Sequence, residues 1–282
     1  MLAVLGAIVA LGVGSSAAKQ LFPVIGAQGT TALRVGLSAL VLLLLWRPWR
    51  WPLTRADVAA IVPYGLVLGG MNLLFYLSIR TIPLGLATAI EFLGPMAVAV
   101  LTSRRAVDFL WVAIAAVGLA LLLPFGHDVT SLDPVGVLYA LGAATCWGLY
   151  IVFGKRTGHL HAGHSVTLGL VVAAILVLPF GIAHAGVALL DAKVLLIGLG
   201  VAVVSSAIPV SLEMVALKRL SHETYSIMVS MEPAVLALIA MPMLDEHLSI
   251  VQWFAIGCTM LASVGSTLTA RRTQGLPEPL PG

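Results

Sequence analysis

Two carboxylates, Glu91 and Glu232, stand near the middle of long apolar runs of the sequence. A charged group at membrane depth is costly, so such a carboxylate usually faces a bundle interior or an aqueous cavity and takes part in function. Pro95 lies four residues after Glu91, and Pro233 follows Glu232 directly. Because proline has no backbone N–H, each one frees a carbonyl group one helical turn earlier, where it can receive an ammonium group or a hydroxyl. The alternative interpretation is a pair of helix kinks whose carboxyl groups are protonated and inert.

Two cations lie in the same apolar part of the chain. Arg34 falls inside the second apolar run, and Lys19 lies near the end of the first. Either cation would suit a substrate carboxylate, or would pair with Glu91 as a structural lock. For Lys19 a third interpretation is equally good, because a long side chain near a helix end can extend its charge into the interface.

Polar and aromatic side chains inside the apolar runs complete the candidate site. They are Asn72, Tyr76, Trp147, Tyr150, Ser226 and Ser230. The first two are four residues apart, as are the two serines, so each pair shares one helix face. The first four would line a cavity with hydrogen-bonding groups and ring faces. The alternative is that the aromatic residues are packing residues or interface anchors, and that the serines bond their own backbone.

No group of residues indicates enzyme chemistry or a metal. His159, His161 and His164 lie close together in the sequence but have no acidic or thiol residue beside them, which favours a solvated connection over a metal site. The sequence has no zinc-protease motif, no nucleophile elbow and no phosphate-binding glycine motif. We therefore expect no catalytic residue, no metal and no cofactor.

The composition indicates a membrane protein. Of the 282 residues, 60% are hydrophobic and 10% are charged, with a mean hydropathy of +1.07, whereas soluble domains carry about 25% charged residues. The net charge of +3 does not indicate nucleic acid, because no basic cluster stands outside the apolar runs. Cys146 and Cys258 both lie inside apolar runs, where buried, inert thiols are expected.

The apolar runs predict an all-α integral membrane protein with ten transmembrane helices. About 20 apolar residues cross a bilayer, and the runs between charges, prolines and turn residues are 2–22, 28–46, 57–78, 83–102, 108–126, 134–154, 164–185, 192–213, 221–243 and 249–270. Backbone groups in lipid must be bonded within the segment, which favours helices over open strands. The first run has no basic segment before it and no cleavage site after it, so we expect it to be retained as a span.

Lysine and arginine residues between the runs predict the orientation. Eleven lie on one side: Arg47, Arg50, Arg55, Arg104, Arg105, Lys155, Arg156, Lys218, Arg219, Arg271 and Arg272. Three lie on the other: Lys19, Arg80 and Lys193. Because positive residues accumulate on the cytoplasmic side of a membrane, both termini are expected in the cytoplasm.

The sequence also repeats itself at an interval of 138 residues. Arg80, Thr88, Pro95 and Ala99 correspond to Lys218, Ser226, Pro233 and Ala237. Five spans in each half would invert the second half relative to the first, and inverted halves are typical of secondary transporters with a site between them. We therefore predict repeats at 1–126 and 134–271, a connection at 127–133 and a disordered tail at 272–282.

Several short strings carry a resemblance to a known family. They include Thr31–Arg34, Gly69–Asn72, Leu74–Ile79, Glu91–Pro95, Cys146–Gly148 and Glu232–Ala234. On these strings, residues 1–271 resemble the drug/metabolite transporter superfamily with paired EamA domains, and within it the threonine/homoserine exporters. The resemblance implies efflux of small amino acids across a bacterial inner membrane by alternating access. Exporters of aromatic or other hydrophobic amino acids, or of drugs, share this architecture and stay open as alternatives.

Together these features favour a transporter that works as a monomer, since ten spans are enough for one chain to enclose a cavity. We expect an amino acid as the substrate and the lipid bilayer as the surroundings. Protons as the coupling ion are a hypothesis prompted by the carboxylates at membrane depth. A membrane-embedded enzyme or sensor is the alternative from a different class, but the basic connections supply no catalytic group for it.

Overall fold

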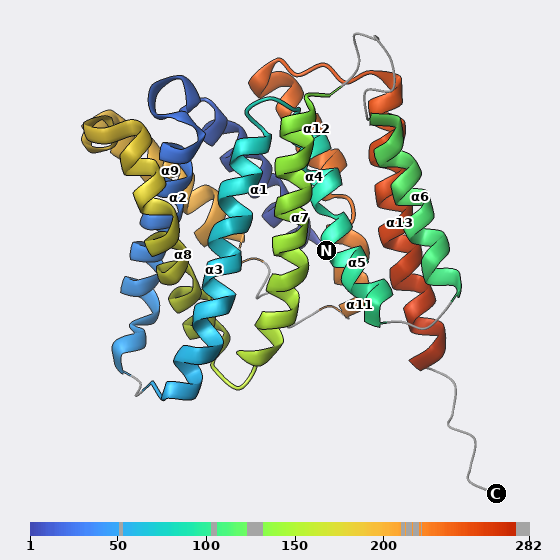
Figure 1. Ribbon diagram of the computed structural model, residues 1–282, viewed down its shortest axis with the longest axis horizontal. Helices are drawn as coiled ribbons and strands as arrows, with labels where there is room; N and C mark the ends of the chain where they lie inside the picture. Colours follow the sequence, from blue (N-terminus) through green and yellow to red (C-terminus); the bar gives the residue numbers. More distant parts are fainter. Residues whose placement is uncertain are drawn as a thin grey trace, which may run out of the picture.

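The computed structural model describes residues 1–50, 53–102, 106–122, 132–209, 212, 216, 220 and 222–274. Within these residues every regular element is a helix, and the helices pack side by side in one bundle (Figure 1). The first part of the chain forms α1 (Leu2–Lys19), α2 (Phe22–Trp46), η1 (Pro48–Arg50), α3 (Arg55–Ser78), α4 (Leu84–Glu91), α5 (Leu93–Thr102) and α6 (Ala106–Leu122). The second part forms α7 (Pro134–Arg156), α8 (Ala162–Ala185), η2 (Gly186–Leu190), α9 (Ala192–Ala202), η3 (Val203–Ala207), α11 (His222–Val229), α12 (Glu232–Leu244) and α13 (Ile250–Gln274).

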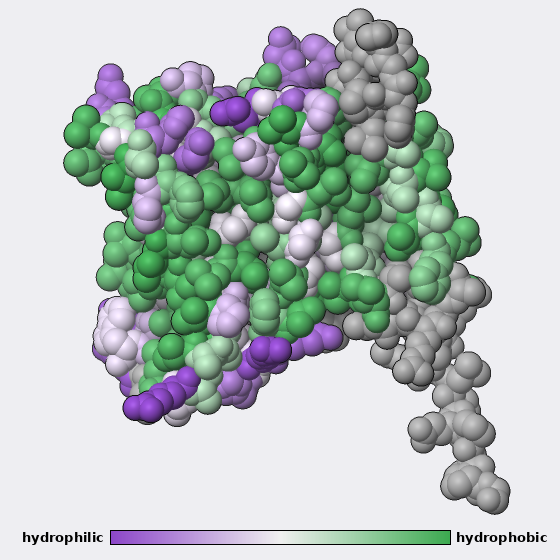
Figure 2. All heavy atoms as spheres, in the orientation of Figure 1, coloured by the Kyte–Doolittle hydropathy of each residue, from purple (hydrophilic) through white to green (hydrophobic). Residues whose placement is uncertain are grey.

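Seven helical segments of the described chain are long and apolar enough to cross a membrane. Shorter apolar helices lie within the remaining predicted spans at 83–102, 108–126 and 192–213. Figure 2 shows apolar side chains over the middle of the visible face and polar side chains collected at its two ends. An apolar belt between polar ends is the surface that suits a bilayer, so the prediction of an all-α membrane protein is confirmed.

Two of the predicted spans are kinked near the middle, and we call each kink a break. The regular α-helical pattern is interrupted at Phe92, between α4 and α5, and at Ser230 and Met231, between α11 and α12, although Phe92 and Met231 keep helical backbone angles. Pro95 and Pro233 lie in the first turn of α5 and of α12, where a missing N–H costs least. Phe92 and Ser230 are 138 residues apart, so the breaks occur where the sequence repeat makes the two segments equivalent.

The predicted boundaries need two corrections. α2 begins at Phe22 rather than at residue 28, and it bends at Gly26, whose φ of 69° suits glycine because it has no Cβ. α13 continues to Gln274, and so overlaps the first three residues of the predicted tail at 272–282. Residues 275–282 of the tail, and 127–131 of the predicted connection, lie outside the described part of the chain.

The closest helix pairs join the two halves of the chain. α2 packs along α8, α3 along α7 and α8, α6 along α13, and α4 along α12. α1 packs against α12 and η3, and α7 packs in the corresponding way against α5 and α3. Glycines permit this closeness: a Cβ at Gly65 would lie 2.6 Å from the carbonyl oxygen of Gly169, so the backbones of α3 and α8 nearly touch. The largest core cluster accordingly draws on both halves.

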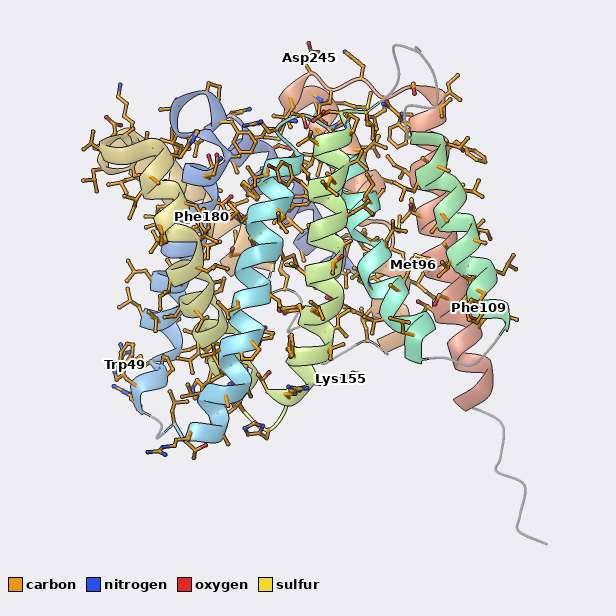
Figure 3. All side chains as sticks on the ribbon, in the orientation of Figure 1. Trp49, Met96, Phe109, Lys155, Phe180 and Asp245 are labelled. Carbon is orange, nitrogen blue, oxygen red and sulfur yellow. The ribbon has the colours of Figure 1, made fainter. Side chains whose placement is uncertain are left out.

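The two ends of the bundle differ in charge. Trp49 and Lys155 lie at one end and Asp245 at the other (Figure 3). We call the first of these the basic end, because its described connections carry Arg47, Arg50, Arg55, Lys155 and Arg156. The C-terminal end of α13 also lies there (Figure 1).

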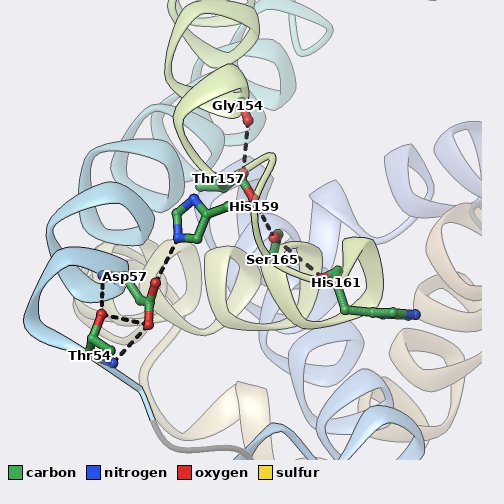
Figure 4. A network of polar contacts seen from close by, with 7 residues as sticks. All are labelled: Thr54, Asp57, Gly154, Thr157, His159, His161 and Ser165. Atoms are coloured by element: carbon green, nitrogen blue, oxygen red, sulfur yellow. Dashed lines mark hydrogen bonds and ion pairs between the residues drawn. The ribbon is translucent and has the colours of Figure 1, made fainter.

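A polar network ties α3 to the α7–α8 connection at the basic end (Figure 4). Thr54 and Asp57 form a capping box, with Thr54 N donating to Asp57 Oδ2 over 2.8 Å and Asp57 N donating to Thr54 Oγ1 over 3.2 Å. The other carboxylate oxygen of Asp57 lies 2.7 Å from His159 Nε2. One of the three clustered histidines thus has an acidic partner from another helix. Among the described residues, no group of three or more such side chains could hold a metal ion.

Candidate functional site

A central cavity of about 340 Å³ lies among α1, α2, α3, α4, α7, α11 and α12. Its polar lining consists of Ser15, Arg34, Asn72, Glu91, Trp147, Tyr150, Tyr225 and Glu232, and its apolar lining of Leu11, Leu68, Met71, Phe75, Val229 and Leu236. Both broken helices and both halves of the chain contribute to it. Six of the predicted site residues therefore meet in one place, and the cavity falls in the size range of about 300–1,000 Å³ that is typical of small-molecule sites.

The two carboxylates that line this cavity lie at opposite ends of their helices, one at a C-terminal end and one at an N-terminal end. Glu91 is the last residue of α4, and Glu232 is the first residue of α12. Glu91 is 9% exposed, and it makes no hydrogen bond or ion pair with the residues that the structure describes. The N-terminal end of a helix stabilises a negative charge, and the C-terminal end opposes one. The backbone therefore gives Glu232 the more favourable position for a permanent charge.

Arg34 is held by neutral partners. Its Nε donates to Ser205 Oγ over 2.8 Å, and its Nη1 donates to Asn72 Oδ1 over 2.7 Å. None of the described carboxylates forms an ion pair with Arg34, so the predicted lock between Arg34 and Glu91 is not formed. An anion that enters the cavity meets a fixed cation with N–H groups suited to a carboxylate.

Tyr76, which was predicted to line the cavity, instead lies behind it. Its side chain is fully buried beside Phe22, and the guanidinium carbon of Arg34 lies 5.3 Å from the centre of its ring. A cation over an aromatic face is attracted to it at this distance. Asn72, one turn earlier, lines the cavity, accepts from Arg34 and donates to the carbonyl of Leu68. Tyr76 thus positions the cation and does not border the space.

Trp147 and Tyr150 line the cavity as predicted, and both are fixed by ring contacts. Trp147 meets Phe92 edge to face, with ring centres 4.9 Å apart. Tyr150 stacks on Tyr64 with a centre distance of 4.9 Å, and the Tyr64 hydroxyl donates to the Tyr150 hydroxyl over 3.0 Å. Aromatic pairs of this kind restrict the rings, so the wall of the cavity is preorganised.

Comparisons with known proteins identify the family. Residues 134–268 match the EamA-like transporter family. The threonine/homoserine exporter RhtA of Escherichia coli strain K12 is 48% identical over 265 residues, which cover 94% of this chain and 90% of that protein. This chain belongs to the EamA-like transporter family. Membership confirms both the resemblance drawn from the short strings and the interpretation as a transporter rather than an enzyme.

A second relative and a solved structure are also similar to this chain. The threonine/homoserine exporter RhtA of Salmonella typhimurium strain LT2 is 49% identical over 259 residues, which cover 92% of this chain and 88% of that protein. A crystal structure of a protein with 17% identity matches with a TM-score of 0.58 over 97% of this chain and 98% of its own. At that identity the likeness concerns the fold alone.

Lys19 lies outside the central cavity of this EamA-family chain. Its Nζ donates to Glu246 Oε1 over 2.6 Å, and the backbone N–H of Leu84, the first residue of α4, donates to Glu246 Oε2 over 2.8 Å. We call this group, Lys19 with Leu84 and Glu246, the Glu246 anchor. It joins the end of α1 to the start of α4, so the predicted contacts of Lys19 with a substrate or with Glu91 are not those that the structure shows.

Ser226 and Ser230 also lie outside the central cavity. Ser226 lines a second cavity of about 300 Å³ between α5, α7, α11 and α13. Ser230 is fully buried, donates to the carbonyl of Ser226 over 2.9 Å and lies 2.7 Å from the hydroxyl of Ser263. Ser230 therefore bonds the backbone of its own helix, as the alternative interpretation expected, and also links that helix to α13. Ser226 borders the second cavity instead.

Sequence reasoning missed Ser205, Ser15 and Tyr225. Ser205 lies in η3, a π-helical turn of a kind often found at functional sites. Its hydroxyl donates a hydrogen bond to the carbonyl of Val201 and accepts one from Arg34. The pair Ser205–Ser206 interrupts an apolar run, and that interruption was a usable signal. Ser15 and Tyr225 carry no comparable signal, because serine and tyrosine are common in membrane helices.

Proposed function

We propose that this chain exports threonine, homoserine and related small amino acids across the inner membrane of a bacterial cell. The observation that carries the proposal is the meeting of two carboxylates and one guanidinium in a cavity at membrane depth. A free amino acid is a zwitterion, and burying either of its charges is costly unless that charge is paired. The names of the relatives, threonine/homoserine exporters, support the same substrate class.

In the proposed complex the substrate ammonium lies against Glu232 and Glu91, and its carboxylate lies against Arg34. Trp147 and Tyr150 border the space for the substrate side chain. Broken helices serve this purpose in transporters because they present helix ends and unbonded carbonyl groups to a substrate inside the membrane. Here the break in each helix lies beside a carboxylate of the cavity.

Alternating access by two inverted repeats, 1–126 and 134–271, is part of the proposal. Three observations support it: the breaks at equivalent positions, the pairing of corresponding helices across the halves, and the uneven distribution of Lys and Arg. The basic end then faces the cytoplasm, with both termini on that side and ten crossings in between. The proposed transporting unit is a single chain, and a proton carried by Glu91 is the proposed coupling ion.

Flux measurements on purified protein in liposomes test the proposal. Labelled threonine should leave loaded vesicles faster than it leaves empty-lipid controls, and Arg34→Gln should reduce kcat/KM by at least about tenfold because the substrate carboxylate loses its cation. Asp245→Asn is the control, because the Asp245 side chain is 96% exposed and does not line the cavity. Absence of threonine flux would contradict the substrate class, and normal flux in Arg34→Gln would make that residue structural.

Export of aromatic amino acids is a second candidate function, favoured by one observation. Phe75, Trp147, Tyr150 and Tyr225 place four rings around the central cavity. A panel of competing amino acids ranks the two candidates in the same flux assay. Stronger competition by phenylalanine or tryptophan than by homoserine would favour the aromatic substrate class.

A further inference from the structure

The second cavity lies beneath both helix breaks. Phe92, Pro95 and Met96 line it at the break between α4 and α5, and Ser226 and Val229 line it from α11. Figure 1 shows α5 and α11 in the half of the bundle toward the basic end, below α4 and α12, and Figure 3 labels Met96 on α5. A molecule that passes between the basic end and the central cavity along the broken helices therefore meets this space.

The two cavities adjoin each other. Trp147, Tyr225 and Val229 line both of them. The ring of Trp147 is held edge-on by Phe92, which belongs to the lining of the second cavity. These shared side chains form a partition whose movement would open one space to the other.

Several hydroxyl groups line the second cavity. They belong to Tyr225 and Ser226 of α11 and to Ser263, Ser266 and Thr267 of α13. In a membrane helix a hydroxyl usually bonds the carbonyl one turn earlier, as Thr267 does with Ser263 over 3.0 Å. The hydroxyls of Ser226 and Ser266 make no hydrogen bond with any described residue, although both border the cavity. Two hydroxyls are thus available to a molecule inside it.

Charge also separates the two cavities. Among the described residues that line the second cavity none is charged, whereas the described lining of the central one contains Arg34, Glu91 and Glu232. Neutral hydrogen bonds are individually weak, so a polar molecule held only by hydroxyls binds loosely and exchanges quickly. Weak binding and fast exchange are the properties required of a site that a substrate occupies only briefly.

We infer that the second cavity is a loading subsite for a hydroxylated small amino acid, in which the Ser226 and Ser266 hydroxyls bind the substrate before it passes Trp147 and Tyr225 into the central cavity. The inference rests on the proposed function, since it concerns the same substrate. The ligand chemistry is that of a small polar amino acid, able to donate to and accept from hydroxyl groups.

Cysteine protection tests the subsite. In a background with Cys146→Ser and Cys258→Ser, the variants Ser226→Cys and Ser266→Cys should react with a small thiol reagent, and saturating threonine should slow both reactions about threefold or more. The slowing should persist when Glu232→Gln is added, because that change disables the central site and leaves the subsite intact. Thr145→Cys is the matched control, since Thr145 lines neither cavity; its reaction should not respond to threonine.

Two results would overturn the subsite. One is equal reaction rates with and without threonine at both serine positions. The other is protection that vanishes with Glu232→Gln, because it would then report movement caused by binding in the central cavity. In either case threonine flux by the unmodified protein would leave the proposed function standing, whereas loss of flux itself would remove both.

Transport kinetics supply an independent measurement. Ser226→Ala combined with Ser266→Ala should raise KM for threonine about tenfold and leave the maximal rate unchanged, because two hydrogen bonds of the loading step are removed. Thr145→Ala should leave KM as it is. An unchanged KM in the double variant would contradict the subsite.

Discussion

The two broken helices share a backbone interruption but differ in their chemistry. In one, Glu91 directly precedes the break, and in the other, Glu232 follows it. The 138-residue interval makes Val229 equivalent to Glu91 and Gly94 equivalent to Glu232. Val229 lines the central cavity with an apolar side chain, while Gly94 packs so tightly on α7 that a Cβ would overlap the carbonyl of Ala144.

This difference shows that the repeat supplies helix ends and that single residues supply the chemistry. Each half contributes one carboxylate, but to opposite kinds of helix end, so the two acids are not interchangeable. A helix N-terminus favours a standing negative charge. We therefore propose that Glu232 binds the substrate ammonium and that Glu91 carries the exchangeable proton, and the following experiments test this division of roles.

The largest effect is expected from Glu232→Gln. The amide keeps the shape of the side chain and removes its charge, so the substrate ammonium loses an ionic partner at a cost of about 3 kcal/mol, or more than a hundredfold in kcat/KM. Efflux of labelled threonine from proteoliposomes measures this loss, with Asp245→Asn as the control. Wild-type efflux by Glu232→Gln would mean that this break supplies no essential anion.

Glu91→Gln should separate coupling from binding. Exchange of threonine across the vesicle membrane should persist within about tenfold of wild type, because Glu232 still holds the ammonium. Net efflux should lose its dependence on pH, because the amide cannot carry a proton. Exchange and efflux measured side by side at several pH values test this, and a pH dependence equal to that of the wild type would rule out Glu91 as the proton carrier.

Pro95→Ala and Pro233→Ala test whether the two breaks act as matched hinges. Each change restores an N–H that can bond the carbonyl one turn earlier and close the break, so transport should fall about tenfold while the amount of folded protein stays unchanged. Pro63→Ala is the control, because α3 continues past Pro63 without interruption. A loss confined to one of the two variants would contradict equivalence of the hinges.

Glu246→Gln should have the smallest effect. The amide can still accept from Leu84 but no longer pairs with Lys19, and both partners of that pair are largely buried, with 11% and 20% of their side chains exposed. The free energy of unfolding should fall by about 1 kcal/mol, with less than about a threefold change in threonine flux. Thermal unfolding of the purified protein measures it. A flux loss as large as that of Glu232→Gln would place Glu246 in the transport cycle itself.

The membrane class, the approximate positions of the helices and the candidate polar residues could be predicted from the sequence alone. The lipid constrains each segment separately, because a span must be apolar and a charge buried within it is usually functional. Arg34, Glu91 and Glu232 stand out for that reason, and the prolines mark the breaks because a missing N–H is a local property of the chain.

Which of these residues meet could not be predicted without the folded structure. Whether a side chain borders a cavity depends on the rotation of its helix and on partners far away in the chain. Tyr76 therefore lies behind Arg34, Lys19 is taken up by Glu246, and Ser205 reaches Arg34 from a π-helical turn. Ser226 and Ser230 share a helix face, yet Ser226 lines a cavity, whereas Ser230 is buried against α13 and bonds the hydroxyl of Ser263. These positions depend on contacts between segments that are remote in the sequence. The spacing of residues within one helix cannot predict such contacts.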